Sequence, residues 1–344
     1  MEGVIVAGVL ALLGVVGVSL MPVMRYAPYA YGNARVRARS SRLFSEGEIR
    51  ELARKEHIDI IYELDTRGYP LLSFEKEGFR EESVQNLLRS RHFSELRELS
   101  RFLPGSDRSF FDALASLSDY EFMITVVRSK TNPFYESLLL SDIVLESSVF
   151  SRGDVERSRS MSLDDFMARV RGSVYSNLID AHASSMRNGN IASFEKACYE
   201  HYYARLLSSA KLPVLRGFAK REVDAFNVKM ALSFMGADPI RGGTLDAERL
   251  SSLSSVRSVD DLVRIVSGTY LEVLAEESSA AGMVRRLLRI QRDAVRAAAR
   301  RDPLGIAQVL SYYCAYRIEL RNVRIILKLV HARFDPVEIE EAIV

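Results

Sequence analysis

The stretch Glu222-Val-Asp224-Ala-Phe-Asn227 occurs in related form at two other places in the chain, and this recurrence decides how the fold is interpreted. The counterparts are Asp119-Tyr-Glu-Phe122 and Glu319-Leu-Arg-Asn322, and each opens an apolar run. A second motif precedes each copy and contains Asp59, then Asp164 with Asp165, then Asp260 with Asp261. The step between the two motifs is 60, 60 and 59 residues, counted from Asp59, Asp164 and Asp260. Such regular spacing predicts an internal repeat, which favours a structural or docking body over an enzyme.

The acid of each motif shares a helical face with the residue three positions later, because these residues lie one turn apart. An acid and an amide among apolar residues are costly to bury unless they are hydrogen-bonded, so they are expected to fasten helices together inside each repeat. The alternative is that they line a surface that receives a partner. The residue five positions after the acid marks a different face, and it is Lys229 in the second copy and Arg324 in the third.

Length and composition indicate a folded protein of two or three domains. The 344 residues are 48% hydrophobic and 27% charged, as in ordinary globular proteins. With 47 basic and 45 acidic side chains the net charge is +2, which is too balanced to indicate nucleic acid as a partner. Two cysteines, Cys198 and Cys314, provide neither a disulfide framework nor a metal cluster, and they fit a reducing compartment.

Apolar residues recur at helical spacing from Ser45 onward, and the chain has no convincing strand, so an all-α fold is predicted. A serine followed three residues later by an acid predicts capping boxes at Ser45, Ser162 and Ser258. Long helices are predicted over residues 109–130, 192–212, 214–235, 281–299 and 306–332. The repeats divide the chain into units of 26–145, 146–240 and 241–344, with boundaries near Pro133 and in the loop of residues 236–243.

The first 25 residues form a separate hydrophobic segment. Residues 3–24 carry no charge and are long enough, at about 1.5 Å per residue, to cross about 30 Å of hydrocarbon. The segment is a poor signal peptide, since no basic residue precedes it, and the arginines that follow place the rest of the chain in the cytoplasm. A single N-terminal anchor is therefore predicted. The competing interpretations are an apolar helix docked on a partner and a start codon placed too early.

Motifs for catalysis, cofactors and metals are missing from the sequence. The five histidines have no metal-ligand spacing, and there is no phosphate-binding glycine loop or nucleophile elbow. We therefore expect no catalytic, cofactor or metal site and no small-molecule substrate. A basic helix face is the remaining candidate for a polar partner surface, the alternative being a solvated face, and its members are Arg285, Arg286, Arg289, Arg292, Arg296, Arg300 and Arg301.

Several motifs, in their order along the chain, resemble the C subunit of the archaeal A-type (V-type) ATP synthases, the counterpart of the d subunit of the V-ATPases. The resemblance covers about residues 26–344. It rests on Tyr29-Ala-Tyr-Gly-Asn-Ala-Arg-Val-Arg-Ala-Arg-Ser-Ser-Arg-Leu, Glu222-Val-Asp224-Ala-Phe-Asn227, Asp302-Pro-Leu-Gly305, Glu319-Leu-Arg-Asn322-Val-Arg324-Ile-Ile and Ile339-Glu-Glu-Ala-Ile-Val. The sequence departs from the family in its long apolar N-terminus and in its first repeat, where Phe122 and Ile124 replace the amide and the base.

The resemblance implies an all-helical funnel of three pseudo-threefold-related domains, which is a non-catalytic central-stalk subunit on the cytoplasmic face of the cell membrane. A protein of this kind couples the rotor shaft to the membrane proteolipid ring during proton- or sodium-driven ATP synthesis or hydrolysis. The predicted partner contacts are Arg35, Arg37 and Arg39 on the membrane side and Asn227, Lys229, Asn322 and Arg324 near the socket for the shaft. The alternative is a membrane-anchored helical-repeat scaffold unrelated to the ATPase.

Overall fold

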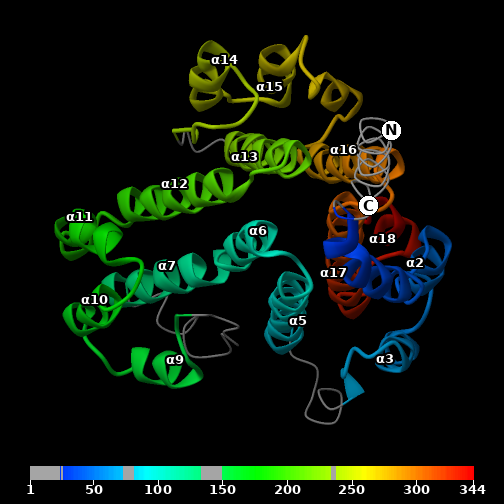
Figure 1. Ribbon diagram of the computed structural model, residues 1–344, viewed down its shortest axis with the longest axis horizontal. Helices are drawn as coiled ribbons and strands as arrows, with labels where there is room; N and C mark the ends of the chain where they lie inside the picture. The colour runs from blue at the N-terminus through cyan, green and yellow to red at the C-terminus, as the bar shows by residue number, and fades with distance from the viewer. Residues whose placement is uncertain (1–23, 25, 73–80, 133–148, 234–237) are drawn as a thin grey trace, which may run out of the picture.

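The computed structural model describes residues 24, 26–72, 81–132, 149–233 and 238–344 (Figure 1). Within these ranges the regular elements are helices and no strand is present, which confirms the predicted all-α class. Apart from Met24, the hydrophobic N-terminal segment lies outside the described residues. No helix among the described residues combines the length and the apolar character needed to cross a membrane.

A helix over residues 26–40 comes first. The labelled α-helices are α2 Glu46–Leu52, α3 His57–Thr66, α5 Glu81–Arg101, α6 Gly105–Ala115, α7 Leu117–Thr131, α9 Arg152–Ser158, α10 Leu163–Arg171, α11 Ser176–Arg187, α12 Ile191–Ser209, α13 Pro213–Leu232, α14 Ala247–Ser252, α15 Val259–Val266, α16 Ala280–Arg301, α17 Ala307–His331 and α18 Pro336–Ala342. Two 3₁₀ turns, η2 Leu253–Ser255 and η3 Glu272–Glu276, flank α15.

The predicted capping boxes explain where three of these helices begin. The hydroxyl oxygens of Ser45 and Ser162 each accept a hydrogen bond from the backbone amide three residues later. In return, the backbone amides of the two serines donate to the carboxylates of Glu48 and Asp165. At Ser258 only half of the box is present. The serine oxygen accepts from the amide of Asp261, but the Asp261 carboxylate accepts from the amide of Arg257 instead.

One long helix predicted over residues 109–130 is wrong, because the chain breaks there into α6 and α7. Ser116 ends one helix and begins the next. Its hydroxyl donates to the carbonyl of Ala113, and the hydroxyl of Ser118 donates to that of Ala115. Serine side chains compete in this way for backbone groups, which weakens the helical ladder at the break.

The helices form three groups around the middle of the molecule (Figure 1). One group contains α7 and α12 with α9, α10 and α11 beyond them, and a second contains α13 and α16 with α14 and α15. The third contains α17 and α18 with α2, α3 and α5. Helix α17, near the C-terminus, thus packs against α2, α3 and α5 from the N-terminal part. Each group therefore joins the end of one predicted repeat to the beginning of the next.

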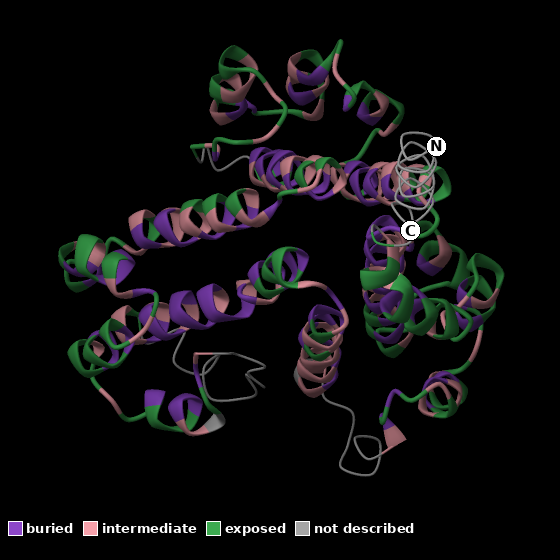
Figure 2. Ribbon diagram, in the orientation of Figure 1, coloured by how far each residue is buried: buried purple, intermediate pink, exposed green. Residues whose placement is uncertain are grey.

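The buried side chains are distributed according to the three groups of helices. Buried side chains concentrate on α7, α13 and α17, whereas α14 has none (Figure 2). A large core extends from Val36 to Ile343, and a smaller one fills the space between α13, α15 and α16. Because α7, α13 and α17 each carry one copy of the repeated motif, the motif lies at the most deeply buried part of each group.

Candidate functional site: three buried carboxylates around a basic cavity

Each repeated motif places one carboxylate in the interior of the protein. Asp119 in α7 is 1% exposed, Asp224 in α13 is 0% exposed and Glu319 in α17 is 6% exposed. Each accepts a hydrogen bond from a tyrosine hydroxyl, at 2.7, 3.0 and 2.6 Å, and the donors are Tyr175, Tyr270 and Tyr69 respectively. We call these three pairs the tyrosine–carboxylate joints. They supply the hydrogen bonds that a buried carboxylate needs.

The tyrosine of each joint comes from the repeat that follows the carboxylate. It lies ten or eleven residues after the aspartate from which the repeat is counted, namely Asp59, Asp164 or Asp260. The first carboxylate thus pairs with the second repeat and the second with the third. The third carboxylate, Glu319, pairs with Tyr69 in the first predicted unit, so the joints connect the three predicted units in a closed cycle.

The second joint is the most extensively hydrogen-bonded. Asp224 also accepts from the backbone amide of Thr244, at 2.9 Å to Oδ2, and from the Thr244 hydroxyl at 2.5 Å. Gly243 lies so close to this carboxylate that a Cβ atom built there would be 1.8 Å from Oδ1. One turn later, Asn227 exchanges two 2.8 Å hydrogen bonds with the backbone of Ile240. Both polar residues of the motif therefore fix the loop that follows α13.

The third joint has the same plan but uses distant parts of the chain. Glu319 accepts from the backbone amide of Phe44 at 2.6 Å as well as from Tyr69. Asn322 accepts from the amide of Val344 at 2.9 Å and donates to its carbonyl at 3.3 Å. Burial raises the pKa of Glu319, although the donors Tyr69 and Phe44 oppose this effect. In the first copy, Phe122 replaces the amide and packs against the ring of Phe150 at a centroid distance of 4.9 Å.

A cavity of about 510 Å³ lies between α5, α13 and α17, and five basic side chains and two carboxylates line it. Lys229 and Arg324, the residues five positions after Asp224 and Glu319, are both in this lining. So are Glu222 and Arg317, each two positions before its carboxylate, and they form an ion pair at 2.5 Å. The cavity therefore receives side chains from equivalent positions of the repeats. We call it the central cavity.

The titratable side chains of the central cavity differ in how far neighbouring opposite charges offset the cost of burial. Burial alone would raise the pKa of Glu222, but Arg317 and Lys229 outweigh it and hold that pKa below its usual value. Burial raises the pKa of Glu121, although Arg89 at 3.4 Å opposes the shift. Burial also lowers the pKa of His92 to about 3, helped by Arg317, so this ring is neutral. Positive charge dominates the cavity as a result.

A family comparison matches nearly the whole of this architecture. The model of the ATP synthase (C/AC39) subunit family matches residues 32–342, which include the carboxylates and tyrosines of all three joints. The chain belongs to this family. Members of the C/AC39 family are structural rather than catalytic subunits of the ATP synthase, so this chain assembles with other subunits of that complex.

Relatives with curated names agree with the family. The chain is similar to the C subunit of the A-type ATP synthase from Thermococcus onnurineus, at 25% identity over 93% of this chain and 91% of the relative. It is also similar to the proteins of the same name from Pyrococcus furiosus, at 21% identity, and Thermococcus kodakarensis, at 23%. These cover 93% and 92% of this chain and 91% and 90% of the relatives, respectively.

The N-terminal arginines predicted as partner contacts lie on the helix over residues 26–40 and make contacts within the chain. Arg35 approaches Glu98 at 3.3 Å, and Arg37 donates to the carbonyl of Pro303 at 3.2 Å. Arg39 pairs with Glu95 at 2.6 Å and also with Glu98. The desolvation of Arg39 is outweighed by these two carboxylates, which raise its pKa. This C/AC39 chain thus uses the three arginines to attach its first helix to α5 and to the connection between α16 and α17.

The amides Asn227 and Asn322 are buried, and their hydrogen bonds go to backbone groups of this chain. Lys229 and Arg324 are exposed residues that line the central cavity. Contact of any of these residues with another subunit stays a prediction. Sequence reasoning missed the three tyrosines and Arg321, although the nearly constant step of ten or eleven residues from the upstream aspartates to Tyr69, Tyr175 and Tyr270 was a signal for the tyrosines.

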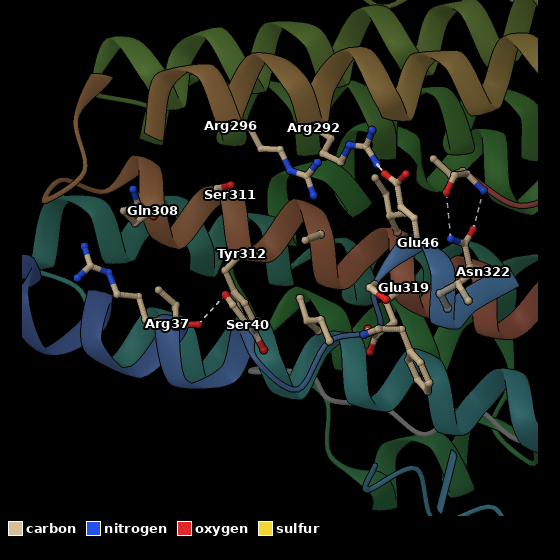
Figure 3. A pocket seen from close by; sticks show the side chains of 18 residues that line it. Arg37, Ser40, Glu46, Arg292, Arg296, Gln308, Ser311, Tyr312, Glu319 and Asn322 are labelled. Carbon is tan, nitrogen blue, oxygen red and sulfur yellow. Dashed lines mark hydrogen bonds and ion pairs between the residues drawn. The ribbon is translucent and has the colours of Figure 1, made fainter. Parts of the chain in front are cut away.

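A second pocket, of about 400 Å³, lies against α16, α17 and the first helix (Figure 3). Arg292 and Arg296 point into it from α16, while Glu319 and Asn322 reach it from α17. Arg292 pairs with Glu46 at 3.2 Å. The predicted basic face is therefore divided, because Arg292 and Arg296 line this pocket whereas Arg286 pairs with Glu276 at 2.6 Å. No group of side chains in the described parts of the chain is arranged to hold a metal ion.

Proposed function

We propose that this chain is the central-stalk subunit of an A-type ATP synthase, and that it couples the rotor shaft to the membrane proteolipid ring. Membership of the C/AC39 family and the names of its relatives support the complex. The observation that carries the coupling role is the closed cycle of joints, two of whose helices, α13 and α17, also line the central cavity. A body that transmits torque must not open under load, and the bond between Glu319 and Tyr69 joins its two ends.

In this proposal the units of residues 26–145, 146–240 and 241–344 are related by a pseudo-threefold axis and form a funnel. Support comes from the three joints, in which equivalent carboxylates on α7, α13 and α17 accept from equivalently placed tyrosines. The axis passes through the central cavity, because equivalent positions of the repeats line it. Such symmetry suits a body that covers one end of a ring and holds a shaft in its middle.

The socket for the shaft is the central cavity, with Lys229 and Arg324 as contacts. Asn227 and Asn322 support the socket indirectly, since they fix the segments that follow α13 and α17. The variant Arg324→Glu is expected to reduce the coupling of ATP hydrolysis to ion transport in the assembled complex. The matched control is Arg300→Glu, on the exposed end of α16. If the charge-reversal variant Arg324→Glu couples ATP hydrolysis to ion transport as well as the unmodified chain does, the assignment of the central cavity as the socket is wrong.

The membrane side of the protein is the end that carries Arg35, Arg37 and Arg39, on the cytoplasmic face of the membrane. The apolar residues 3–24 precede this helix, and we place them in the lumen of the proteolipid ring as a tether. Deleting residues 1–24 is expected to weaken retention of the protein on membranes that contain the ring. Unchanged retention, with the same amount of folded protein, would count against the tether.

The whole proposal is tested by purifying the tagged chain from native membranes and identifying the proteins that accompany it. We expect shaft subunits and the proteolipid to be present in amounts comparable to the tagged chain. A matched purification with the joint variant Glu319→Ala should lose the shaft subunits first if an intact cycle is needed to hold them. Recovery of the chain without any ATPase subunit would contradict the proposed function.

A further inference from the structure

Three cations of the central cavity form no direct ion pair with a carboxylate of the described residues. The cavity contains two carboxylates, and both are already paired, Glu222 with Arg317 at 2.5 Å and Glu121 with Arg89 at 3.4 Å. Lys229, Arg321 and Arg324 remain. Among the described residues no carboxylate lies within 4.0 Å of the side-chain nitrogens of these three. We call them the cation trio.

Arg321 shows that this imbalance reaches the interior. Its Nη1 atom is buried and has no hydrogen-bond partner among the described residues. Burial, together with the neighbouring Arg285 and Arg324, lowers the pKa of Arg321 to about 10. Glu81 interacts electrostatically with Arg324, but its direct ion pair is with Lys328 at 3.0 Å. A half-buried guanidinium without a direct counter-charge is unfavourable, so binding of an anion that reached it would be favoured.

The trio is held in place by the joints. Arg321 and Arg324 lie one turn apart on α17, two and five residues after Glu319, and Lys229 comes from α13, five residues after Asp224. The amides of Gln85 and Asn86 on α5 also line the cavity. A volume of about 510 Å³ lies within the range of about 300–1,000 Å³ found for ligand sites. The site is thus concave, basic and built from fixed helices.

We propose that the central cavity of this chain binds a polyvalent oxyanion at Lys229, Arg321 and Arg324. Guanidinium groups bind carboxylate and phosphate oxygens through paired, charge-assisted hydrogen bonds, and the ammonium group adds a point charge. Two sources carry this chemistry, namely the carboxylates of a protein segment that enters the cavity and a free di- or triphosphate. The protein-segment source rests on the proposed function, because the shaft would enter the same cavity, whereas binding of a free di- or triphosphate does not.

The test is isothermal titration calorimetry of the purified full chain with two probes, inorganic pyrophosphate and a hexaglutamate peptide. At least one probe is expected to bind, and the one that binds more tightly identifies the source. The double variant Arg321→Gln/Arg324→Gln should weaken that binding at least tenfold, because each charge-assisted contact contributes substantially. The matched control Arg300→Gln should bind as the unmodified chain does. Binding must also weaken as salt is raised.

Thermal unfolding separates a binding role from a structural one. Without anion, the double variant should melt at the same temperature as the unmodified chain or higher, because it has lost repulsion between like charges. With the probe, only the unmodified chain and Arg300→Gln should gain stability. Two results would overturn the proposal. One is absence of binding by both probes at millimolar concentration, and the other is binding that the double variant and the control retain equally.

Discussion

The second and third tyrosine–carboxylate joints use the same chemistry over very different distances along the chain. Asp224 finds its partners Thr244 and Tyr270 within the next 46 residues, whereas Glu319 accepts from Phe44 and Tyr69, 275 and 250 residues away. The second joint therefore fixes a local loop, and the third closes the chain on itself. A buried carboxylate with a tyrosine donor can serve either purpose, depending only on which repeat follows it in space.

The largest effect is expected at the second joint. Asp224→Ala would leave the amide and hydroxyl of Thr244 and the hydroxyl of Tyr270 without their acceptor, so the free energy of unfolding should fall by about 3–5 kcal/mol. Asp224→Asn should lose less, because its carbonyl oxygen still accepts. The measurement is urea unfolding followed by circular dichroism. A loss of under about 1 kcal/mol for Asp224→Ala would show that the joint is dispensable.

A smaller effect is expected when only the tyrosine hydroxyl is removed. Tyr69→Phe and Tyr270→Phe should each cost about 1–2 kcal/mol, because each deletes one hydrogen bond to a buried carboxylate. The two variants should differ in where the protein loosens. In hydrogen exchange, Tyr69→Phe should expose α2, α3 and α18, whereas Tyr270→Phe should expose α14 and α15. Identical exchange patterns would remove the distinction between a closing joint and a local one.

The smallest effect is a difference in pH dependence. Because burial raises the pKa of Glu319 above its ordinary 4.5, the folded state holds this proton more tightly than the unfolded state. The resulting stability is fully present below about pH 4.5 and is lost as the pH rises through the higher pKa of the folded state. Glu319→Gln lacks this group, so its stability relative to the unmodified chain should improve from pH 4.5 upward. A constant difference across that range would contradict the raised pKa.

Much of the fold could be predicted from sequence because it depends on local patterns. The helical spacing, the caps at Ser45 and Ser162 and the ends of α16 and α17 follow from residues within a few turns of one another. The break at Ser116 was missed, since two serines interrupt an otherwise apolar helical pattern only weakly. That Asp224 and Asn227 would form hydrogen bonds inside the protein could also be predicted, because buried polar groups require hydrogen-bond partners.

The identity of those partners could not be predicted with the same reasoning. Tyr69 and Glu319 meet only because the first and last repeats pack together, and no local pattern contains that information. Arg321 was missed for a related reason. An arginine two positions after a motif acid is ordinary on a helix, and its uncompensated charge becomes apparent only once the other residues of the central cavity are in place.

The central claim, that the chain closes into a cycle, is tested most directly by cross-linking its two ends. Arg54, in the turn after α2, and Glu340 on α18 are joined by a 2.6 Å ion pair at the surface, while the native Cys198 and Cys314 are buried. In the variant Arg54→Cys/Glu340→Cys, a short bismaleimide should rapidly form an intramolecular link, detected by gel mobility and peptide mass spectrometry. Each single variant serves as the control. Failure of the folded double variant to form this link, or formation of links only between molecules, would contradict the closed cycle.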